Sequence, residues 1–169
     1  MKPVKMPIFA IVPVIAAILC TACSEKLPDG MPKLYPVSVK ITQDGAPLAD
    51  ASVSLVPNDP NLSRWPVAAN TDASGTAKLY TYGYPGCPEG SFKVTVTKTE
   101  ATGGGTDGNP AISQSKTPTR IYWLVEKSFR TADTTPLSLE VKSGKNAEST
   151  FDVGKPAREE KLGPENLTH

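Results

Sequence analysis

The chain has 169 residues, with 18 Lys and Arg, 17 Asp and Glu and one His, so its formal net charge is +1. A near-neutral chain without a basic run offers nothing to attract nucleic acid or an acidic membrane surface. Seventeen prolines and thirteen glycines indicate many turns, and the frequent Val, Thr, Ser and Ala residues favour short strands. The composition therefore predicts one all-β domain.

The first 22 residues follow the pattern of a secretory signal peptide. Lys2 and Lys5 make the start basic, residues 8–19 are apolar apart from a proline, and the chain turns polar at Ser24. This order predicts export through the Sec pathway followed by removal of residues 1–22. The apolar run is too short to span a bilayer, which takes about 20 residues.

The end of this signal carries Cys20 and Cys23 in a C-x-x-C spacing. Thr21 and Ala22 are the small residues that a bacterial lipoprotein signal places before its cysteine, which predicts that Cys23 becomes the lipidated first residue. An ordinary signal peptidase cutting after Ala22 would leave the same first residue without lipid. Either cleavage discards Cys20, so the C-x-x-C pair does not survive into the mature chain.

A metal or redox centre at this motif is disfavoured. His169 is the only His and Cys87 the only third Cys, so a four-ligand zinc site cannot be assembled, and no βαβ pattern follows the motif. We expect a lipid-anchored cell-envelope protein. Ser24 stands where inner-membrane lipoproteins of well-studied bacteria have aspartate, which favours the outer membrane.

Residues 23–34 contain two prolines and predict a semi-rigid tether. The domain is then expected over residues 35–153. Alternation of apolar and polar residues predicts its strands, and these are 35–41, 51–57, 67–71, 76–80, 91–99, 136–141 and 148–153. The apolar segment 120–129 fits either a strand or a short helical turn.

Turn-forming residues separate these strands. Asp44-Gly45 is expected to close a hairpin, DASG (72–75) to join 67–71 and 76–80 as a second hairpin, and residues 143–146 to turn the chain before the last strand. Residues 100–119, with three successive glycines, predict a flexible loop. The charged, Pro-broken segment 154–169 predicts a disordered tail.

Four stretches in order resemble the carboxypeptidase regulatory-like domain. They are GAPLADASVSLVP (45–57), TDASGTAKL (71–79), GCPEGSFKVTV (86–96) and LVEKSFRTADTTPLSLEV (124–141), the last in a version typical of lipoproteins of planctomycete-type bacteria. The chain departs from the pattern at Cys87, at Phe92 and in lacking a proline before Glu126. The resemblance implies a single seven- to eight-stranded Greek-key β-sandwich, prealbumin-like or immunoglobulin-like, and it implies no peptidase activity.

Enzymatic chemistry is not expected. A Ser-His-Asp or Cys-His arrangement would have only His169 to use. Paired carboxylates would be needed for a hydrolase, but the acidic residues lie in predicted turns and on strand exteriors. Two short patterns, Asp72-x-Ser74 and Asp107-x-Asn109, could touch calcium without matching an EF-hand loop. No cofactor and no metal are predicted.

Two further features bear on binding. Tyr80, Tyr82 and Tyr84 alternate, so they could share one face of an extended segment and, with Trp65 or Trp123 nearby, stack on sugar rings or grip a partner. Otherwise they pack the rim of the sandwich. Cys87 is either a thiol that pairs between chains or a small buried hydrophobe. The first expectation is a non-enzymatic lipoprotein presenting a module for binding or assembly with an envelope protein. A carbohydrate-binding module is the alternative, and a carboxylate hydrolase ranks last.

Overall fold

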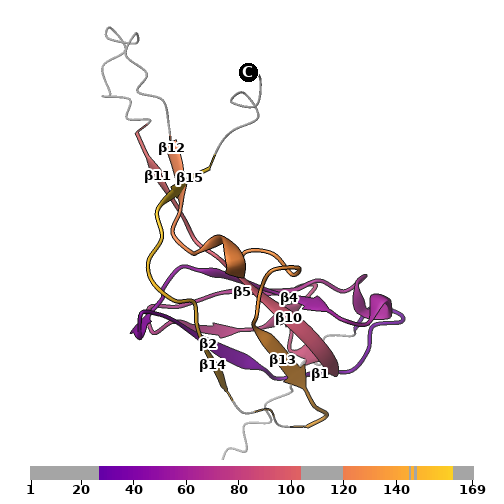
Figure 1. The fold of residues 1–169 in the computed structure, drawn as a ribbon. Coiled ribbons are helices and arrows are strands. Elements are labelled where there is room, and N and C mark those ends of the chain that lie inside the picture. Colours follow the sequence, from indigo (N-terminus) through magenta and orange to yellow (C-terminus); the bar gives the residue numbers. More distant parts are fainter. Residues whose placement is uncertain (1–26, 104–119, 145, 147, 162–169) are drawn as a thin grey trace, which may run out of the picture.

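The computed structural model describes residues 27–103, 120–144, 146 and 148–161, which form a sandwich of β-sheets with a narrow arm projecting from it (Figure 1). The first sheet is antiparallel, with the order β13 (Ser138–Val141), β10 (Gly90–Thr97), β4 (Ser52–Pro57), β5 (Val67–Asn70), β7 (Tyr80–Thr81) and β8 (Tyr84–Pro85). The second centres on β2 (Ser38–Gln43), which pairs in parallel with β14 (Ser149–Asp152) and antiparallel with β3 (Ala46–Pro47) and β6 (Thr76–Lys78). The prediction of an all-β sandwich is confirmed.

Smaller elements lie at the ends of the sandwich. β1 (Leu34–Tyr35) pairs with β9 (Cys87–Pro88), and the arm consists of β11 (Thr99–Thr102), β12 (Arg120–Trp123) and β15 (Glu159–Glu160). Two 3₁₀ turns are η1 (Pro60–Leu62) and η3 (Lys127–Phe129). The sequence of residues 120–129 fitted either a strand or a short helical turn, and the segment contains one of each.

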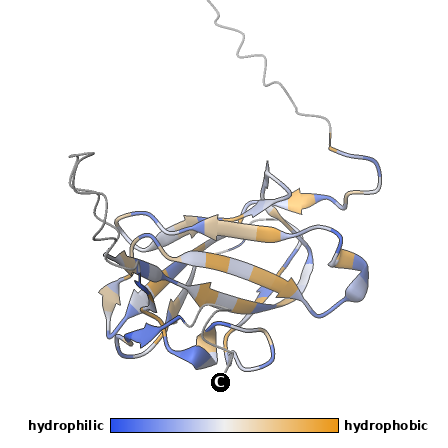
Figure 2. Ribbon diagram, turned by 90° about the horizontal axis from the view of Figure 1, so that it is seen from above, coloured by the Kyte–Doolittle hydropathy of each residue, from blue (hydrophilic) through white to orange (hydrophobic). Residues whose placement is uncertain are grey.

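The core lies between the two main sheets. Figure 2 shows apolar and polar residues alternating along the strands, as expected where one face of a sheet is buried and the other is wet. Burying a large apolar side chain contributes about 1.5–3 kcal/mol to stability, so this interior supplies most of the driving force for folding. The side chains with no exposed surface include Val39, Ile41, Val53, Phe92, Val94 and Val96.

The predicted hairpin across the DASG turn is wrong, although the turn itself is present. The Asp72 amide donates to the Thr76 carbonyl (2.9 Å) and the Gly75 amide to the Asp72 carbonyl (2.9 Å). The strands on either side nevertheless enter different sheets, since β5 pairs with β4 and β7 while β6 pairs with β2. The turn therefore carries the chain across the sandwich.

The last two predicted strands also enter different sheets. β13 lies at the edge of the first sheet beside β10, whereas β14 lies in the second sheet, parallel to β2. Because β13 and β14 lie in different sheets, the segment between them is a second crossing of the sandwich. The Asp44–Gly45 turn between β2 and β3 is, in contrast, the hairpin that the sequence predicted.

The predicted bounds of the C-terminal tail and of the flexible loop need correction. The expected tail is ordered as far as Lys161, because β15 pairs with β12 and the Ala157 amide donates to the Leu124 carbonyl (3.2 Å). The expected flexible loop begins later than residue 100, because β11 continues to Thr102. The predictions made for residues 1–26, 104–119 and 162–169 lie outside the described residues.

Candidate functional site

The predicted lipidation residue, Cys23, lies outside the described residues, which begin at Leu27. From there the chain is held close to the sandwich. The Met31 amide closes a local turn by donating to the Pro28 carbonyl (3.1 Å), and Leu34 and Tyr35 pair with the strand β9 of the domain. The predicted tether of residues 23–34 is therefore too long, since part of this segment is already bound to the domain.

The three alternating tyrosines do not form the predicted stripe. β7 and β8 pair in the register Tyr80↔Pro85 and Thr81↔Tyr84, with a two-residue turn at Tyr82 (φ 51°) and Gly83 (φ 89°). Residues directly opposite each other on a strand pair share a face, and neighbours along a strand alternate. Tyr84 therefore lies on the face of buried Thr81, and Tyr80 lies on the opposite face.

Tyr82, at the tip of this turn, instead meets the predicted partner Trp65. The two rings stand edge to face, with centroids 6.1 Å apart and planes at 81°. The Tyr82 amide donates to the Pro66 carbonyl (2.9 Å), which fixes the turn against this loop. Tyr82 is 63% exposed, whereas Trp65 is only 8% exposed, so the outer ring is presented to solvent and the inner ring supports it.

The 3₁₀ turn η1 positions Trp65. Asp59 caps this turn by accepting a hydrogen bond from the Asn61 amide (2.9 Å), Pro60 supplies the fixed φ of the first helical position, and the Trp65 amide donates to the Leu62 carbonyl (2.9 Å). This turn lies between the predicted strands 51–57 and 67–71. The sequence contained no signal that this loop would meet the segment before β1.

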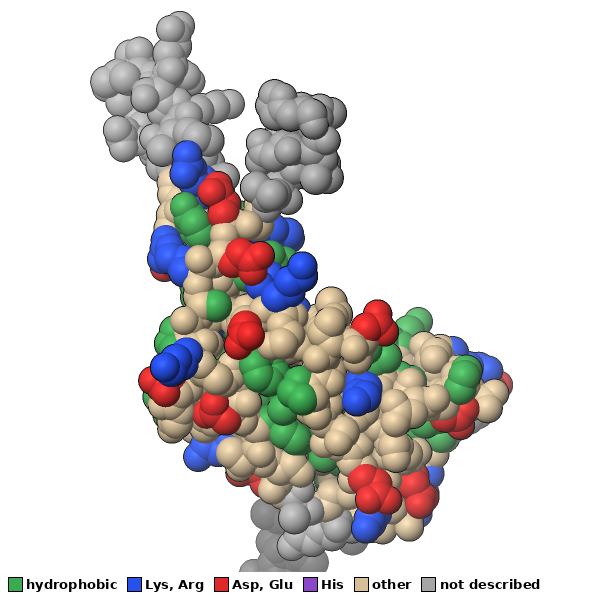
Figure 3. Space-filling view, in the orientation of Figure 1, with side chains coloured by type: hydrophobic (Ala, Val, Ile, Leu, Met, Phe, Trp, Pro, Cys, Tyr) green, Lys and Arg blue, Asp and Glu red, His purple; other side chains and the backbone are tan. Residues whose placement is uncertain are grey.

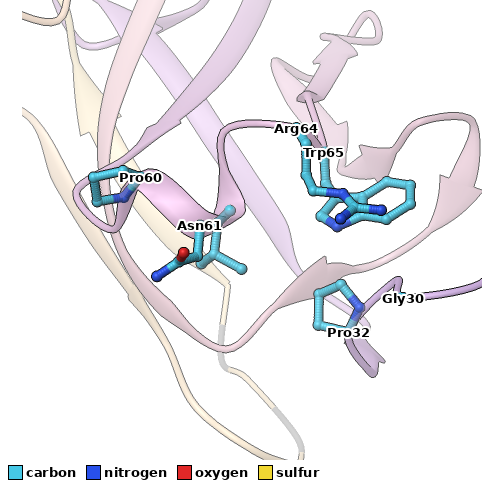
Figure 4. Close-up of a pocket in the computed structure, with 7 residues that line it drawn as sticks. Gly30, Pro32, Pro60, Asn61, Arg64 and Trp65 are labelled. Carbon is cyan, nitrogen blue, oxygen red and sulfur yellow. The ribbon is translucent and has the colours of Figure 1, made fainter.

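Arg64 completes the arrangement. Its guanidinium carbon lies 4.6 Å from the centroid of the Trp65 ring, a cation–π contact. Figure 4 shows Arg64 over Trp65, with Pro32 and Gly30 of the N-terminal segment facing them. We call the group Gly30, Pro32, Arg64, Trp65 and Tyr82 the Trp65 corner.

A shallow open pocket of about 520 Å³ lies at this corner (Figure 4). It offers an apolar floor, one guanidinium and one side-chain amide, which suits binding and supplies no nucleophile or general base. Its lining is Gly30, Pro32, Pro60, Asn61, Leu62, Arg64 and Trp65.

Asp72, the acidic residue of one of the two calcium patterns, stabilises a turn. The Asp72 carboxylate accepts hydrogen bonds from the Ser74 hydroxyl (2.6 Å), the Ser74 amide (2.8 Å) and the Thr76 amide (3.0 Å). These bonds, the Ser74 hydroxyl first, lower the pKa of Asp72. The other calcium pattern, Asp107-x-Asn109, lies outside the described residues.

Cys87 is a fully buried free thiol within β9. Burial raises the pKa of the Cys87 thiol to about 12, because the charged thiolate would lose its hydration. Of the two interpretations that the sequence left open, this environment fits the small buried hydrophobe.

The arm holds a second aromatic group, which the sequence did not reveal. Arg130 and Lys161 each place their charge 5.1 Å from the Trp123 ring centroid, and Arg158 lies 4.3 Å from the ring centroid of Tyr122. Figure 3 shows positive and negative side chains mixed along the arm. The aromatic rings of β12 are thus covered by the chain's own C-terminal segment.

Ion pairs reinforce this cover. Arg158 pairs with Glu100 (2.9 Å) and Arg130 pairs with Glu159. The Arg130 side chain is only 10% exposed, and its buried Nε has no hydrogen-bond partner among the described residues. The guanidinium of Arg130 is therefore held mainly by Glu159 and by the face of Trp123.

Within residues 27–103, 120–144, 146 and 148–161, no three His, Cys, Asp or Glu side chains gather as a metal site would require. In the same part of the chain, no helix has the length and apolar character needed to cross a membrane. Comparison with protein-family models, with curated proteins and with solved structures finds no match to this chain.

Proposed function

We propose that this chain is a non-enzymatic lipoprotein of the cell envelope that presents a β-sandwich for binding or structural assembly. The observation that carries the proposal is the N-terminal order: a basic start, a short apolar run, and then Thr21, Ala22 and Cys23. Cys23 would carry the lipid and hold the protein to a membrane, with the outer membrane favoured by Ser24.

The described domain supports a binding role over a catalytic one. The carboxylates of Asp72 and Asp152 each accept hydrogen bonds from two amides and a hydroxyl, those of Asp72 within its own turn and those of Asp152 from Gly154 and from the β2–β3 turn region. The pocket at the Trp65 corner is lined by one guanidinium and one amide without an adjacent acid–base pair. Binding surfaces commonly combine an aromatic anchor with Arg in this way.

We also propose that the domain is of the carboxypeptidase regulatory-like kind. Two of the motifs that carry the resemblance have a clear structural use: Asp44-Gly45 makes the β2–β3 turn, and Asp72 and Gly75 shape the crossing turn. These uses explain why an Asp and a Gly stand at these positions. They support the resemblance without extending it to an activity.

Metabolic labelling with radioactive palmitate tests the anchor. The wild-type chain should be labelled, Cys23→Ala should not, and Cys20→Ala should be labelled as the wild type is, since this residue leaves with the signal. An unlabelled wild-type chain that is nevertheless cut after Ala22 would show the ordinary signal peptidase at work and would contradict the lipoprotein proposal.

A carbohydrate-binding module remains the alternative, with less support than the sequence suggested. Stacking on sugars needs exposed ring faces on one surface, and Tyr80 and Tyr84 lie on opposite faces of their strand pair. Tyr82 is the exposed ring that remains at the corner. A glycan array probed with the wild type and with Tyr82→Ala tests this role, and binding that survives the substitution would exclude Tyr82 from it.

A further inference from the structure

Few residues separate Cys23 from the sandwich. The segment 30–35 lies against the sandwich through the pocket wall at Gly30 and Pro32 and the pairing of β1 with β9. Gly30 is seven residues from Cys23, so even a fully extended chain between them spans at most about 25 Å. A lipid on Cys23 would thus hold the Trp65 corner near the membrane surface.

The opposite end of the sandwich lies far from that point. Strand β10 begins at Gly90, where an added Cβ would lie 3.2 Å from the Leu62 Cδ1 of η1, and ends at Thr97, just before the arm strand β11. An eight-residue strand is about 25 Å long. Trp123, which pairs with Thr99, is therefore separated from Trp65 by about the length of the sandwich, as the positions of η1 and the arm in Figure 1 illustrate.

The side chains at the corner suit the interface between water and lipid. Tyr and Trp prefer the headgroup level of a bilayer because one end of each ring system is apolar and the other is polar. Tyr82 is 63% exposed at the tip of a turn, and Arg64 can extend toward a phosphate. Pro32 and Leu62 add apolar surface to the same pocket.

Charge at the corner is balanced. Asp59 caps η1 next to the pocket, and Asp29 and Lys33 flank the segment that lines it. A mixed surface of this kind does not depend on anionic lipids, so contact with a zwitterionic headgroup is expected to persist at high salt.

We infer that the Trp65 corner is the membrane-facing surface of the protein, resting on phospholipid headgroups, and that the arm points away from the membrane. The inference rests on the proposed lipid anchor and adds an orientation to it. The occupant of the corner is then the headgroup layer itself, and the surface left for a soluble partner is the arm and the outer faces of the sheets.

The two tryptophans allow a matched test. Full-length protein would be purified in its lipidated form and placed in phosphatidylcholine vesicles whose acyl chains carry bromine, which quenches nearby tryptophan. Trp123→Phe leaves the corner residue as the fluorophore, and Trp65→Phe leaves the arm residue. We expect loss of emission from Trp65 and unchanged emission from Trp123, at both low and high salt. Equal quenching of both, or stronger quenching of Trp123, would overturn the inference.

A second pair of variants avoids any packing defect at Trp65. Tyr82→Cys and Arg120→Cys place a thiol at the corner and near the end of the arm, while Cys87 is buried and Cys23 carries the lipid. A polarity-sensitive dye should shift to shorter wavelength on vesicles at position 82 and not at position 120. A lipidated protein without this shift overturns the orientation alone, whereas absence of lipid on Cys23 overturns the anchor proposal. A glycan that changes the emission of the dye at position 82 in vesicle-free protein, together with no shift on vesicles, would assign the corner to sugars and overturn the orientation as well.

Discussion

At the scale of single residues, two glycines differ in one physical respect. Gly75 and Gly45 have nearly the same positive φ, 78° and 77°, but a Cβ on Gly75 would lie 2.5 Å from the Ile41 carbonyl oxygen, whereas a Cβ on Gly45 would meet nothing within 4 Å. The left-handed conformation costs an Ala about 1–2 kcal/mol, and a clash with backbone adds about 1–3 kcal/mol. Gly75→Ala should therefore lower the free energy of unfolding by about 3 kcal/mol or more, and Gly45→Ala by about 1 kcal/mol.

Urea denaturation of both variants checks this difference. The two substitutions add the same methyl group at the same backbone conformation, so Gly45→Ala is the control for the conformational cost. Equal losses of stability would show that the second sheet yields around Gly75 and that the crossing turn is not tightly packed.

Cys87 gives a second prediction at this scale. Its thiol is buried, and a pKa of about 12 keeps it protonated in the folded protein at neutral pH. In a chain with Cys20 and Cys23 replaced by Ser, a thiol reagent at pH 8 should not modify Cys87 until the protein is unfolded. Ser74→Cys provides an exposed control that should react at once. Rapid modification of Cys87 in the folded chain would instead favour pairing between chains.

The same pKa fixes the sign of a pH dependence. An unfolded thiol ionises near pH 9.0, whereas the folded one keeps its proton up to about pH 12. The contribution of Cys87 to stability is therefore complete below pH 9.0 and is lost as the pH rises toward 12. The difference in stability between the wild type and Cys87→Ala should shrink over this range.

At the scale of elements, Asp152 ties the end of β14 to the turn between β2 and β3. Its carboxylate accepts hydrogen bonds from the Thr42 hydroxyl (2.7 Å), the Gly45 amide (3.0 Å) and the Gly154 amide (2.8 Å). These bonds, the hydroxyl first, lower the pKa of Asp152 below its usual 3.8. The Asp152 side chain thus stabilises the parallel pairing of β14 with β2 by hydrogen bonds to residues more than 100 positions earlier in the chain.

Because the folded pKa is lowered, this stabilisation is present above pH 3.8 and is lost as the pH falls through the folded pKa. Asp152→Asn should lower the melting temperature at pH 7, and its difference from the wild type should shrink below about pH 3.8. Asp133→Asn, at an exposed acid after η3, controls for the lost charge. If neither substitution changed the melting temperature, Asp152 would not stabilise the pairing of β14 with β2.

The arm permits a prediction about its third strand. β15 brings Arg158 over Tyr122, Lys161 over Trp123 and Glu159 to Arg130. Ending the chain after Pro156 should uncover these rings and leave the Arg130 charge without its partner. We expect a red shift of Trp123 emission and faster proteolysis within the arm, while the sandwich melts close to its original temperature. A chain ending after Lys161 is the matched reference. Identical emission spectra for the two chains would show that β15 and its neighbours do not cover the rings of Tyr122 and Trp123.

At the scale of the whole molecule, orientation should depend on the length of the N-terminal connection. Inserting a flexible Gly-Ser segment between Ser24 and Leu27 would let the domain move away from the membrane, because the free connection would become several times longer. We expect lipid labelling and the melting temperature to remain unchanged while quenching of Trp65 by brominated lipid declines. Undiminished quenching would show that the corner binds lipid strongly enough without a short connection.

The fold could be predicted from the sequence where the signal is local. Alternation located β2, β4, β10, β13 and β14, and Asp44-Gly45 located a hairpin, because side-chain direction and turn conformation depend on neighbouring residues. The short strands β7, β8, β9 and β15 have two residues each, too few for a periodic pattern. β7 and β15 each pair with a longer strand, β5 and β12, whereas β8 pairs with β7 and β9 pairs with β1, so these pairings are set by contacts that a period cannot reveal.

The candidate site could be predicted only in part. Trp65 and Tyr82 were both identified, but the stripe through Tyr80 and Tyr84 was wrong because the chain reverses at Tyr82 and Gly83. Arg64, Pro32 and Gly30 were missed. Arg64 precedes Trp65 in the chain and lies over its ring, whereas Pro32 and Gly30 line the same pocket from the segment before β1, an approach that no spacing in the sequence encodes.

The sequence by itself determined that the chain is all-β and where its main strands run. It also carries the prediction that Cys23 is lipidated and anchors the chain to a membrane. The tertiary structure decided which sheet each strand joins, that the DASG turn crosses the sandwich, and that Gly30 and Pro32 line one pocket with Trp65. The reason is that strand periodicity is a property of adjacent residues, whereas pairing and packing partners are chosen by burial among segments distant in the chain.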